Sequence, residues 1–243
     1  MRTSNPTLSE KAFLEQRADS AENAMTINGT INKTGLLTLL IFAAAYFSWQ
    51  SAISAQGNIT IWIWGGAIGG FIVALVTVFK KKWAGITGPI YAVLEGLFLG
   101  AISALFEQQF AGIVFQAILL TFGTLAIMLI TYRAGWIKVT QKFRSGMIMA
   151  TGAIVLVYLI SFVMQMFGAH MPFIHSGGTF GIIFSLVVVG IAALNLLLDF
   201  DFIERGANSN APKYMEWYGA FSLMVTIIWL YLEILRLLSK IRR

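Results

Sequence analysis

Long apolar runs separated by short polar segments dominate the chain. Seven of these runs have about the 20 residues that a helix needs to cross the hydrocarbon core of a bilayer. The alternation of apolar and polar residues that an outer-membrane barrel requires is absent. We therefore predict an all-α, polytopic membrane protein, and we expect its C-terminal helix to be central in the bundle. The predicted spans are 35–55, 59–79, 86–106, 110–132, 146–168, 178–201 and 217–238.

A polar segment of mixed charge precedes the first apolar run. No signal peptide is evident in it, so we predict a cytoplasmic N-terminal tail over residues 1–34 and a seven-helix transmembrane domain over 35–243. Short polar separators at 56–58 (Gln-Gly-Asn) and 107–109 (Glu-Gln-Gln) are predicted to form tight turns.

Composition excludes several functional classes. Of the 243 residues, 58% are hydrophobic and 12% are charged, whereas an average soluble domain has about 25% charged residues. The absence of cysteine rules out disulfides, a thiol nucleophile and a cysteine-based metal site. The motifs of phosphate-binding loops, serine hydrolases and zinc proteases are also absent from the sequence. We therefore expect neither an enzyme nor a protein with a bound cofactor.

The basic residues predict the orientation in the membrane. The net charge of +6 reports loop topology rather than nucleic-acid binding. Thirteen of the 17 basic residues lie in the tail and in the loops after the second, fourth and sixth spans, and the short loops on the other side carry none. The positive-inside bias therefore places the N-terminus in the cytoplasm.

The last four basic residues do not fit this orientation. If the seventh span crosses fully, they lie outside, so either the tail is exported with its charge or the last helix does not cross in a simple way. These residues are Arg236, Lys240, Arg242 and Arg243.

Carboxylates in or next to the apolar runs are candidate functional groups, because an ionised carboxylate in hydrocarbon is costly. Asp199 and Asp201 end the sixth span. In one interpretation they are solvated in the headgroup layer. In the other they gate or coordinate a cation, and Asn195, one turn before Asp199 on the same face, favours this second interpretation. Glu95 lies near the middle of the third span. It is protonated, paired with a base or facing an aqueous cavity.

Two further pairs of residues leave alternatives open. Glu233 and Arg236 are three residues apart on one face of the last span, so either they pair locally or Arg236 pairs with Glu95 across helices. His170 and His175 lie in the loop before the sixth span. A zinc site needs further convergent ligands, and none is near in the sequence.

Short motifs near the C-terminus are similar to those of a known family. The sixth span ends in Asp199-Phe-Asp-Phe-Ile203, and the seventh contains Phe221–Thr226 and Leu232–Leu238. With the span count and the three lysines after the second span, these motifs resemble the transmembrane Bax inhibitor motif family, and Tyr91–Ser103 resembles its bacterial branch. The resemblance implies a pH-modulated passive leak for calcium or other cations in a bacterial inner membrane.

The resemblance also implies roles for single residues. Asp199 takes the place of the family's sixth-span aspartate and Arg236 that of its seventh-span arginine. The family's second aspartate, which forms a pH-sensitive hydrogen-bonded pair with the first, falls on Thr226. The family's acid in the second span is missing from the glycine-rich region around Gly69, and Glu95 is expected to replace it as the partner of Arg236.

We accordingly expect an ion path bordered by Asp199, Glu95 and Arg236, with Asp199 and Glu95 as transient calcium ligands, since calcium prefers oxygen. Because Thr226 stands in place of an aspartate, the expected pH response is weaker than that of an acid pair, unless Asp201 couples to Asp199. An aqueous crevice reaching Glu95 would favour conduction.

The alternative is a non-conducting regulator that binds another membrane protein, such as a membrane protease. Its acids would be paired and dry, and its glycine faces would form the partner interface. These faces are formed by Gly65, Gly66, Gly69 and Gly70 in the second span and by Gly96 and Gly100 in the third. A proton-coupled transporter is less well supported, because neither paired broken helices nor an inverted repeat is visible.

Overall fold

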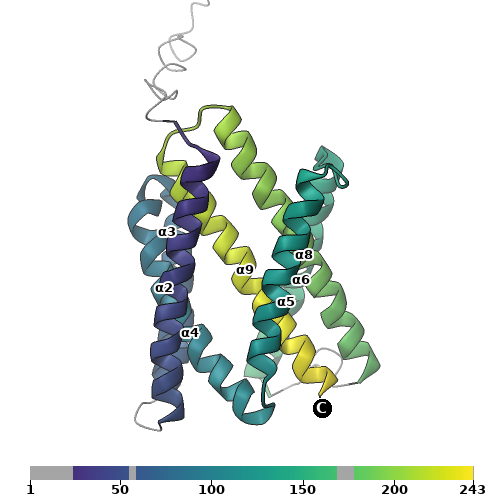
Figure 1. Ribbon diagram of the computed structural model, residues 1–243. Coiled ribbons are helices and arrows are strands. Elements are labelled where there is room, and N and C mark those ends of the chain that lie inside the picture. Colours follow the sequence, from purple (N-terminus) through teal and green to yellow (C-terminus); the bar gives the residue numbers. More distant parts are fainter. Residues whose placement is uncertain (1–23, 55–58, 169–177, 243) are drawn as a thin grey trace, which may run out of the picture. The chain divides into compact units, whose positions relative to one another are not determined.

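The computed structural model describes residues 24–54, 59–168 and 178–242. Within these residues, seven helices are long and apolar enough to cross a membrane, and the only extended pairing is an isolated bridge between Ala24 and Pro212 (Figure 1). This confirms the predicted all-α, polytopic class.

The helices follow one another in the order that the apolar runs predicted. They are α2 (Ile27–Ile53), α3 (Ile59–Phe79), α4 (Ala84–Gln109), α5 (Ile113–Arg133), α6 (Gln141–Met166), α8 (Thr179–Asn208) and α9 (Tyr214–Ile241), and a short 3-10 turn, η3 (Lys81–Trp83), precedes α4. The first helix begins within the segment assigned to the tail, because Thr26 caps it by accepting a hydrogen bond from the Gly29 amide.

The predicted turn at 107–109 is wrong. Glu107 and the two residues after it still belong to α4, and the chain reverses at Gly112, whose φ is 77°. The Glu107 carboxylate accepts hydrogen bonds from the amides of Gly112 (2.5 Å) and Val114 (3.1 Å). It thus satisfies amides that the start of α5 leaves without helical partners. The other predicted turn, 56–58, lies outside the described residues.

The chain divides into two compact units. The first comprises Met1–Ile102 and Asp201–Met224, and the second Ser103–Phe200 and Val225–Arg243. Helices α4, α8 and α9 each contribute to both units. More than half of the most apolar part of α9 is buried (56%), the largest share among the seven spans. This burial agrees with the expectation that the C-terminal helix is central.

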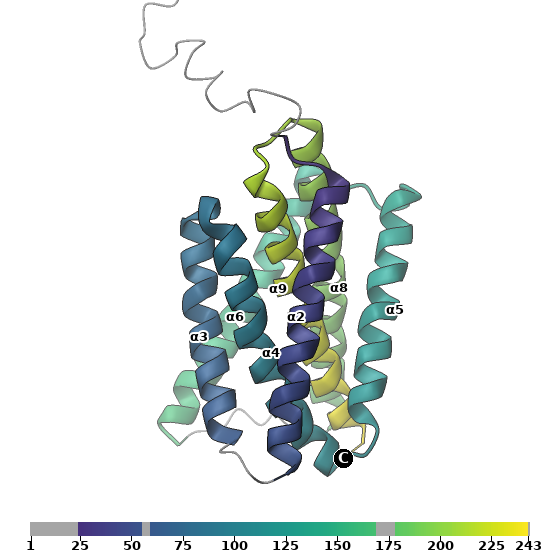
Figure 2. The ribbon, with the colours of Figure 1, turned by 60° about the vertical axis from the view of Figure 1, so that its left-hand side comes forward.

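Glycines bring α3 and α4 close together in the first unit (Figure 2). A Cβ atom added at Gly66 would stand 2.7 Å from the backbone oxygen of Leu94, and one at Gly70 would stand 2.6 Å from the Glu95 carboxylate. Real Cβ atoms do not approach this closely, so at Gly66, where the neighbour is backbone, only glycine permits the contact, whereas at Gly70 the Glu95 side chain could move.

Glycines of α4 also permit a close approach to α2. A Cβ atom at Gly96 would stand 2.6 Å from the backbone oxygen of Ile41, and one at Gly100 would overlap the backbone oxygen of Ala45. Four of the glycines that were predicted to form a partner interface therefore pack against other helices of the first unit. They are Gly66, Gly70, Gly96 and Gly100.

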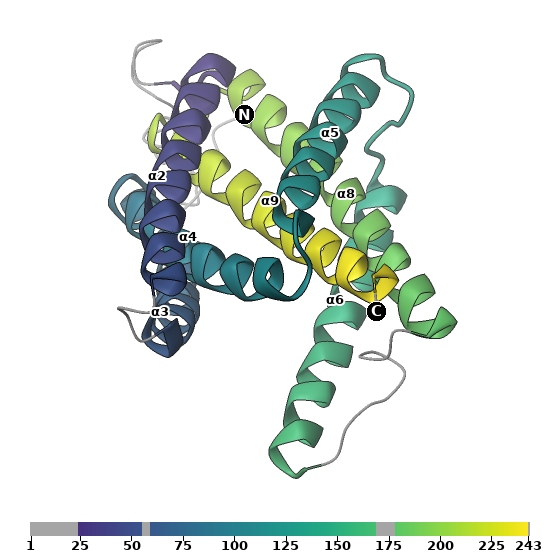
Figure 3. The ribbon, with the colours of Figure 1, turned by 60° about the horizontal axis from the view of Figure 1, so that its bottom comes forward.

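The second unit groups α5, α6 and α8 near the C-terminal half of α9 (Figure 3). The rings of Tyr132 in α5 and Phe200 in α8 lie 5.8 Å apart. The hydroxyls of Ser103 in α4 and Tyr231 in α9 share a hydrogen bond of 2.6 Å. These contacts join α5 to α8 and the end of α4 to α9.

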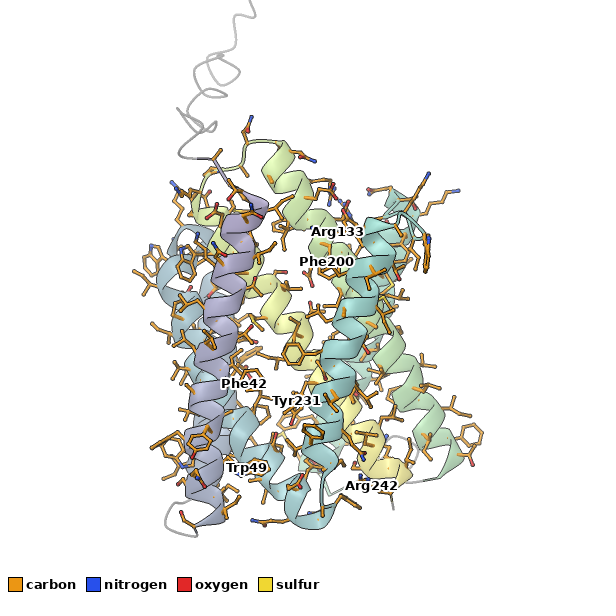
Figure 4. All side chains as sticks on the ribbon, viewed as in Figure 1. Phe42, Trp49, Arg133, Phe200, Tyr231 and Arg242 are labelled. Carbon is orange, nitrogen blue, oxygen red and sulfur yellow. The ribbon has the colours of Figure 1, made fainter. Side chains whose placement is uncertain are left out.

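The basic C-terminal residues bind within the second unit. Arg242, at the end of α9 (Figure 4), donates to the Ala111 carbonyl (2.8 Å) and to the Gln116 side chain (2.9 Å). Lys240 is buried, with 4% exposed. The helix is unbroken over 28 residues, more than a full crossing needs. Of the four basic residues that disagreed with the predicted orientation, the three that the structure describes lie on or directly after a helix long enough to cross, and protein groups bind each of them.

Candidate functional site

Polar side chains from α6, α8 and α9 meet within the second unit. On α6 and α9 most of them recur at intervals of seven residues, which is two helical turns and keeps them on one face. On α8, Ser185 and Asp199 are four turns apart, and Asn195 lies one turn before Asp199. We call this set the polar seam. Its members are Thr151 and Tyr158 on α6, Ser185, Asn195 and Asp199 on α8, and Thr226, Glu233, Arg236 and Lys240 on α9.

Asp199 and Thr226 form one end of the polar seam. The Thr226 hydroxyl donates to Oδ2 of Asp199 over 2.5 Å, and the two residues are 8% and 9% exposed. The structure thus joins the two positions at which the family resemblance expects a hydrogen-bonded pair, although one of them lacks a carboxylate. The alternative in which Asp199 is solvated in the headgroup layer is not what the structure shows, because this residue is buried.

The neighbouring acid binds elsewhere. The Asp201 carboxylate forms an ion pair of 2.6 Å with Arg205, one turn further along α8. The hydrogen bond of Asp199 and the ion pair of Asp201 thus involve different residues, Thr226 and Arg205, as a spacing of two residues on a helix suggests. Asn195, one turn before Asp199, donates to the Thr151 hydroxyl of α6 over 3.0 Å. The polarity that the sequence indicated on this face of α8 thus continues toward α6.

A cluster of the buried Glu233 with the half-buried Arg236 and Tyr158 forms the middle of the polar seam. Nη1 of Arg236 donates to both carboxylate oxygens of Glu233 (2.8 and 3.0 Å) and to the Tyr158 hydroxyl (2.7 Å). The Tyr158 hydroxyl in turn donates to the carboxylate at 2.9 Å. The guanidinium lies 4.9 Å from the centre of the tyrosine ring, a favourable cation–π position. Of the two alternatives for Arg236, the local pair with Glu233 is therefore present.

Lys240 and Ser185 form the other end of the polar seam. The ammonium donates to the Ser185 hydroxyl (2.7 Å) and to the Gly181 carbonyl (3.1 Å). Sequence analysis treated Lys240 only as one of the C-terminal basic residues and did not single out Ser185, Thr151 or Tyr158. The seven-residue spacing of Thr226, Glu233 and Lys240 was the signal that could have identified the seam.

Glu95 belongs to the first unit. Its carboxylate lies beside Gly70 of α3 and occupies the space that a side chain at position 70 would take. No residue described in the first unit forms a hydrogen bond or an ion pair with this carboxylate. The acid thus lies against the glycine-rich part of the second span, where the resemblance expected it to replace a missing acid. Its pairing with Arg236, a residue of the second unit, stays a prediction.

Metal ligands are sparse in the part of the chain that the structure describes. It contains no group of three or more histidine, aspartate and glutamate side chains that could hold a metal ion. His170 and His175 lie outside the described residues. The expected transient calcium ligands, Asp199 and Glu95, belong to different units, so a shared role for them stays a prediction.

Comparison with known proteins gives one match. A family model described as Bax inhibitor 1 like matches residues 5–243, essentially the whole chain. No curated protein and no solved structure matches the chain.

Proposed function

The chain belongs to the Bax inhibitor 1 like family, and from this premise we propose that it is a passive, pH-modulated leak for calcium and other cations across a bacterial inner membrane. The observation that carries the proposal is the buried hydrogen bond between Asp199 and Thr226. It lies where the resemblance expects the pH-sensitive acid pair, and it joins α8 to α9. A group at this place can respond to protonation and alter the contact between the two helices.

The polar seam is the proposed route for the ion in the second unit. From Thr226 to Lys240 it extends over roughly 21 Å of helix at 1.5 Å per residue, a large part of the hydrocarbon core of about 30 Å. Carboxylate and hydroxyl oxygens recur along it, and such hard ligands suit calcium. Because these groups are buried and hydrogen-bonded to one another, we assign the structure to a closed state.

Glu95 is proposed to be a further acid of the ion's route, as the resemblance implies. Its carboxylate fills the space beside Gly70, which supports its role as a replacement for the missing acid of the second span. Asp199 and Glu95 would then offer oxygen ligands to a passing cation.

A non-conducting regulator of another membrane protein is the second candidate. The pairing of Glu233, which is only 1% exposed, with Arg236 favours it, since a regulator is expected to have paired, dry acids. The packing of Gly66, Gly70 and Gly96 within the first unit weakens it, because these glycines are not available to a partner. A leak protein in its closed state would also have paired acids.

Calcium flux separates the two candidates. Purified protein in liposomes loaded with a calcium indicator is expected to admit calcium at neutral pH, with a different rate at acidic pH and a background rate in protein-free liposomes. Flux equal to that of empty liposomes at every pH would overturn the leak proposal and favour the regulator.

The proposed orientation has a separate test. With the N-terminus in the cytoplasm, the loops that contain Lys81 and Lys142 face the cytoplasm. Single cysteines placed there, Lys81→Cys and Lys142→Cys, have no background because the chain has no cysteine. In intact cells they should resist a membrane-impermeant thiol reagent and react only after lysis. Labelling from outside would reverse the orientation.

A further inference from the structure

The start of α2 is fastened to the loop between α8 and α9 by a group of contacts in the first unit. Backbone pairing begins it: the Met25 amide donates to the Ala211 carbonyl over 2.7 Å, next to the bridge between Ala24 and Pro212. We call the side chains that complete this attachment the α2 clamp. They are Met25, Thr26, Lys33 and Glu216.

Met25 fills the space between two glycines. Its sulfur lies 2.8 Å from the place of a Cβ atom at Gly206 of α8, and its methyl group lies 3.4 Å from that of a Cβ atom at Gly219 of α9. The side chain is 2% exposed. Met25 thus contacts both helices, and at Gly219 it lies beside Ile203 of α8 and Thr30 of α2, which are 3.2 and 3.3 Å from the place of the same Cβ atom.

Glu216 holds the other side of the clamp. Its carboxylate, in a residue that is 1% exposed, accepts hydrogen bonds of 2.9 Å from the backbone amide and the hydroxyl of Thr26. It also forms an ion pair with Lys33, whose ammonium lies 5.4 Å from the centre of the Trp217 ring. A Cβ atom at Gly29 would overlap this carboxylate. These contacts are all with residues at the start of α2, which therefore covers the carboxylate.

The spacing along α8 and α9 connects the clamp with the proposed sensor. Asp199 precedes Gly206 by seven residues on α8, and Thr226 follows Gly219 by seven on α9. Both helices are continuous over these intervals. Two turns of helix return to the same face, so on each helix the glycine at the clamp and the residue of the hydrogen bond share one face.

We propose that the α2 clamp is a positioning element that fixes the separation of α8 and α9 and thereby keeps Asp199 and Thr226 in contact. A hydrogen bond of 2.5 Å is lost after a displacement of about 1 Å, so a small change in helix separation is enough to break it. Insofar as it concerns conduction, this inference rests on the proposed function: release of the clamp opens the sensor contact and raises the leak.

The coupling between Asp199 and Thr226 tests the clamp without any measurement of conduction. Midpoints of thermal unfolding in detergent are compared for Asp199→Ala, Thr226→Val and the double variant, because each single change removes the hydrogen bond and the departure from additivity then measures their interaction. We expect the same cycle in a Glu216→Gln background to show at most about half of that interaction. Glu107→Gln, which removes a helix-capping carboxylate remote from the clamp in sequence, is the matched control and should leave the interaction unchanged.

Size variants at Met25 provide a second route if Glu216→Gln does not fold. Met25→Ala shortens the side chain between the two glycines and should lower the interaction, whereas Met25→Leu nearly conserves its volume and should retain it. An interaction of full size in both Glu216→Gln and Met25→Ala would overturn the positioning role.

Calcium flux in liposomes separates failure of the clamp from failure of the proposed function. Glu216→Gln should raise the leak at neutral pH by about tenfold, which corresponds to roughly 1.4 kcal/mol in favour of the open state. If the interaction falls but no variant conducts, the positioning role stands and the leak proposal is overturned. If the variants conduct with the interaction intact, the clamp proposal is overturned.

Discussion

Asp199→Asn is expected to abolish the pH dependence of the calcium leak in liposomes. The substitution removes the titratable group at the proposed sensor and keeps a side chain of the same size that can still bond to Thr226. Thr226→Asp should have the opposite effect. It places a second carboxylate within 3 Å or so of the first, where two acids share a proton rather than ionise together, so the response should become stronger and move toward neutral pH.

Two variants control for this experiment. Thr226→Val removes the hydroxyl without adding a charge and should not move the response toward neutral pH. Asp201→Asn removes a carboxylate two residues from Asp199 that is paired with Arg205, and the pH profile should survive it. An unchanged profile in Asp199→Asn liposomes would end the sensor role of Asp199 and favour the regulator.

Arg236→Gln should lower the free energy of unfolding by about 3 kcal/mol, the lower part of the range for breaking a buried ion pair. It leaves the Glu233 carboxylate, whose side chain is 2% exposed, with Tyr158 as a remaining donor. Glu233→Gln should cost less, because the arginine side chain is 37% exposed and long enough to reach toward the headgroups near the end of α9. Unfolding in detergent measures both values.

The double variants show which of the two pairs contributes an interaction free energy to stability. Glu233→Gln combined with Arg236→Gln should be clearly less destabilising than the sum of the two, because neither partner is then left alone. Strict additivity would mean that the local pair contributes nothing. Glu95→Gln combined with Arg236→Gln examines the pairing across helices that the sequence suggested, and non-additivity there would establish it.

Hydrophobicity alone predicted most of the fold. A chain in a bilayer must satisfy its backbone groups internally, so long apolar runs become helices with little ambiguity. All seven were identified, and errors were confined to their ends, as at Glu107, where a capping side chain was taken for a turn. The positions of Asp199 and Thr226 came from short motifs, and the structure joins them directly.

The remaining contacts of the site could not be read from the sequence in this way. Hydropathy indicates which segments lie in the membrane, but it does not indicate which neighbour a polar side chain faces. Lys33 was therefore predicted as a charge of the N-terminal tail and Lys240 as one of the C-terminal basic residues, although protein groups bind both. Glu216 attracted no attention, because an acid at the start of a helix is ordinary, and its partner Thr26 is 190 positions away.

That separation has a consequence for how the protein is made. A chain that enters the membrane from its N-terminus cannot close the α2 clamp until its last helix has been synthesised and inserted. Contacts so distant in sequence carry a high entropic cost and form late. Until then Met25 and Lys33 lack the partners that bury them. The clamp therefore closes only in a chain that has been made as far as Glu216, and a chain that stops before this residue lacks the hydrogen bonds and the ion pair that hold the start of α2.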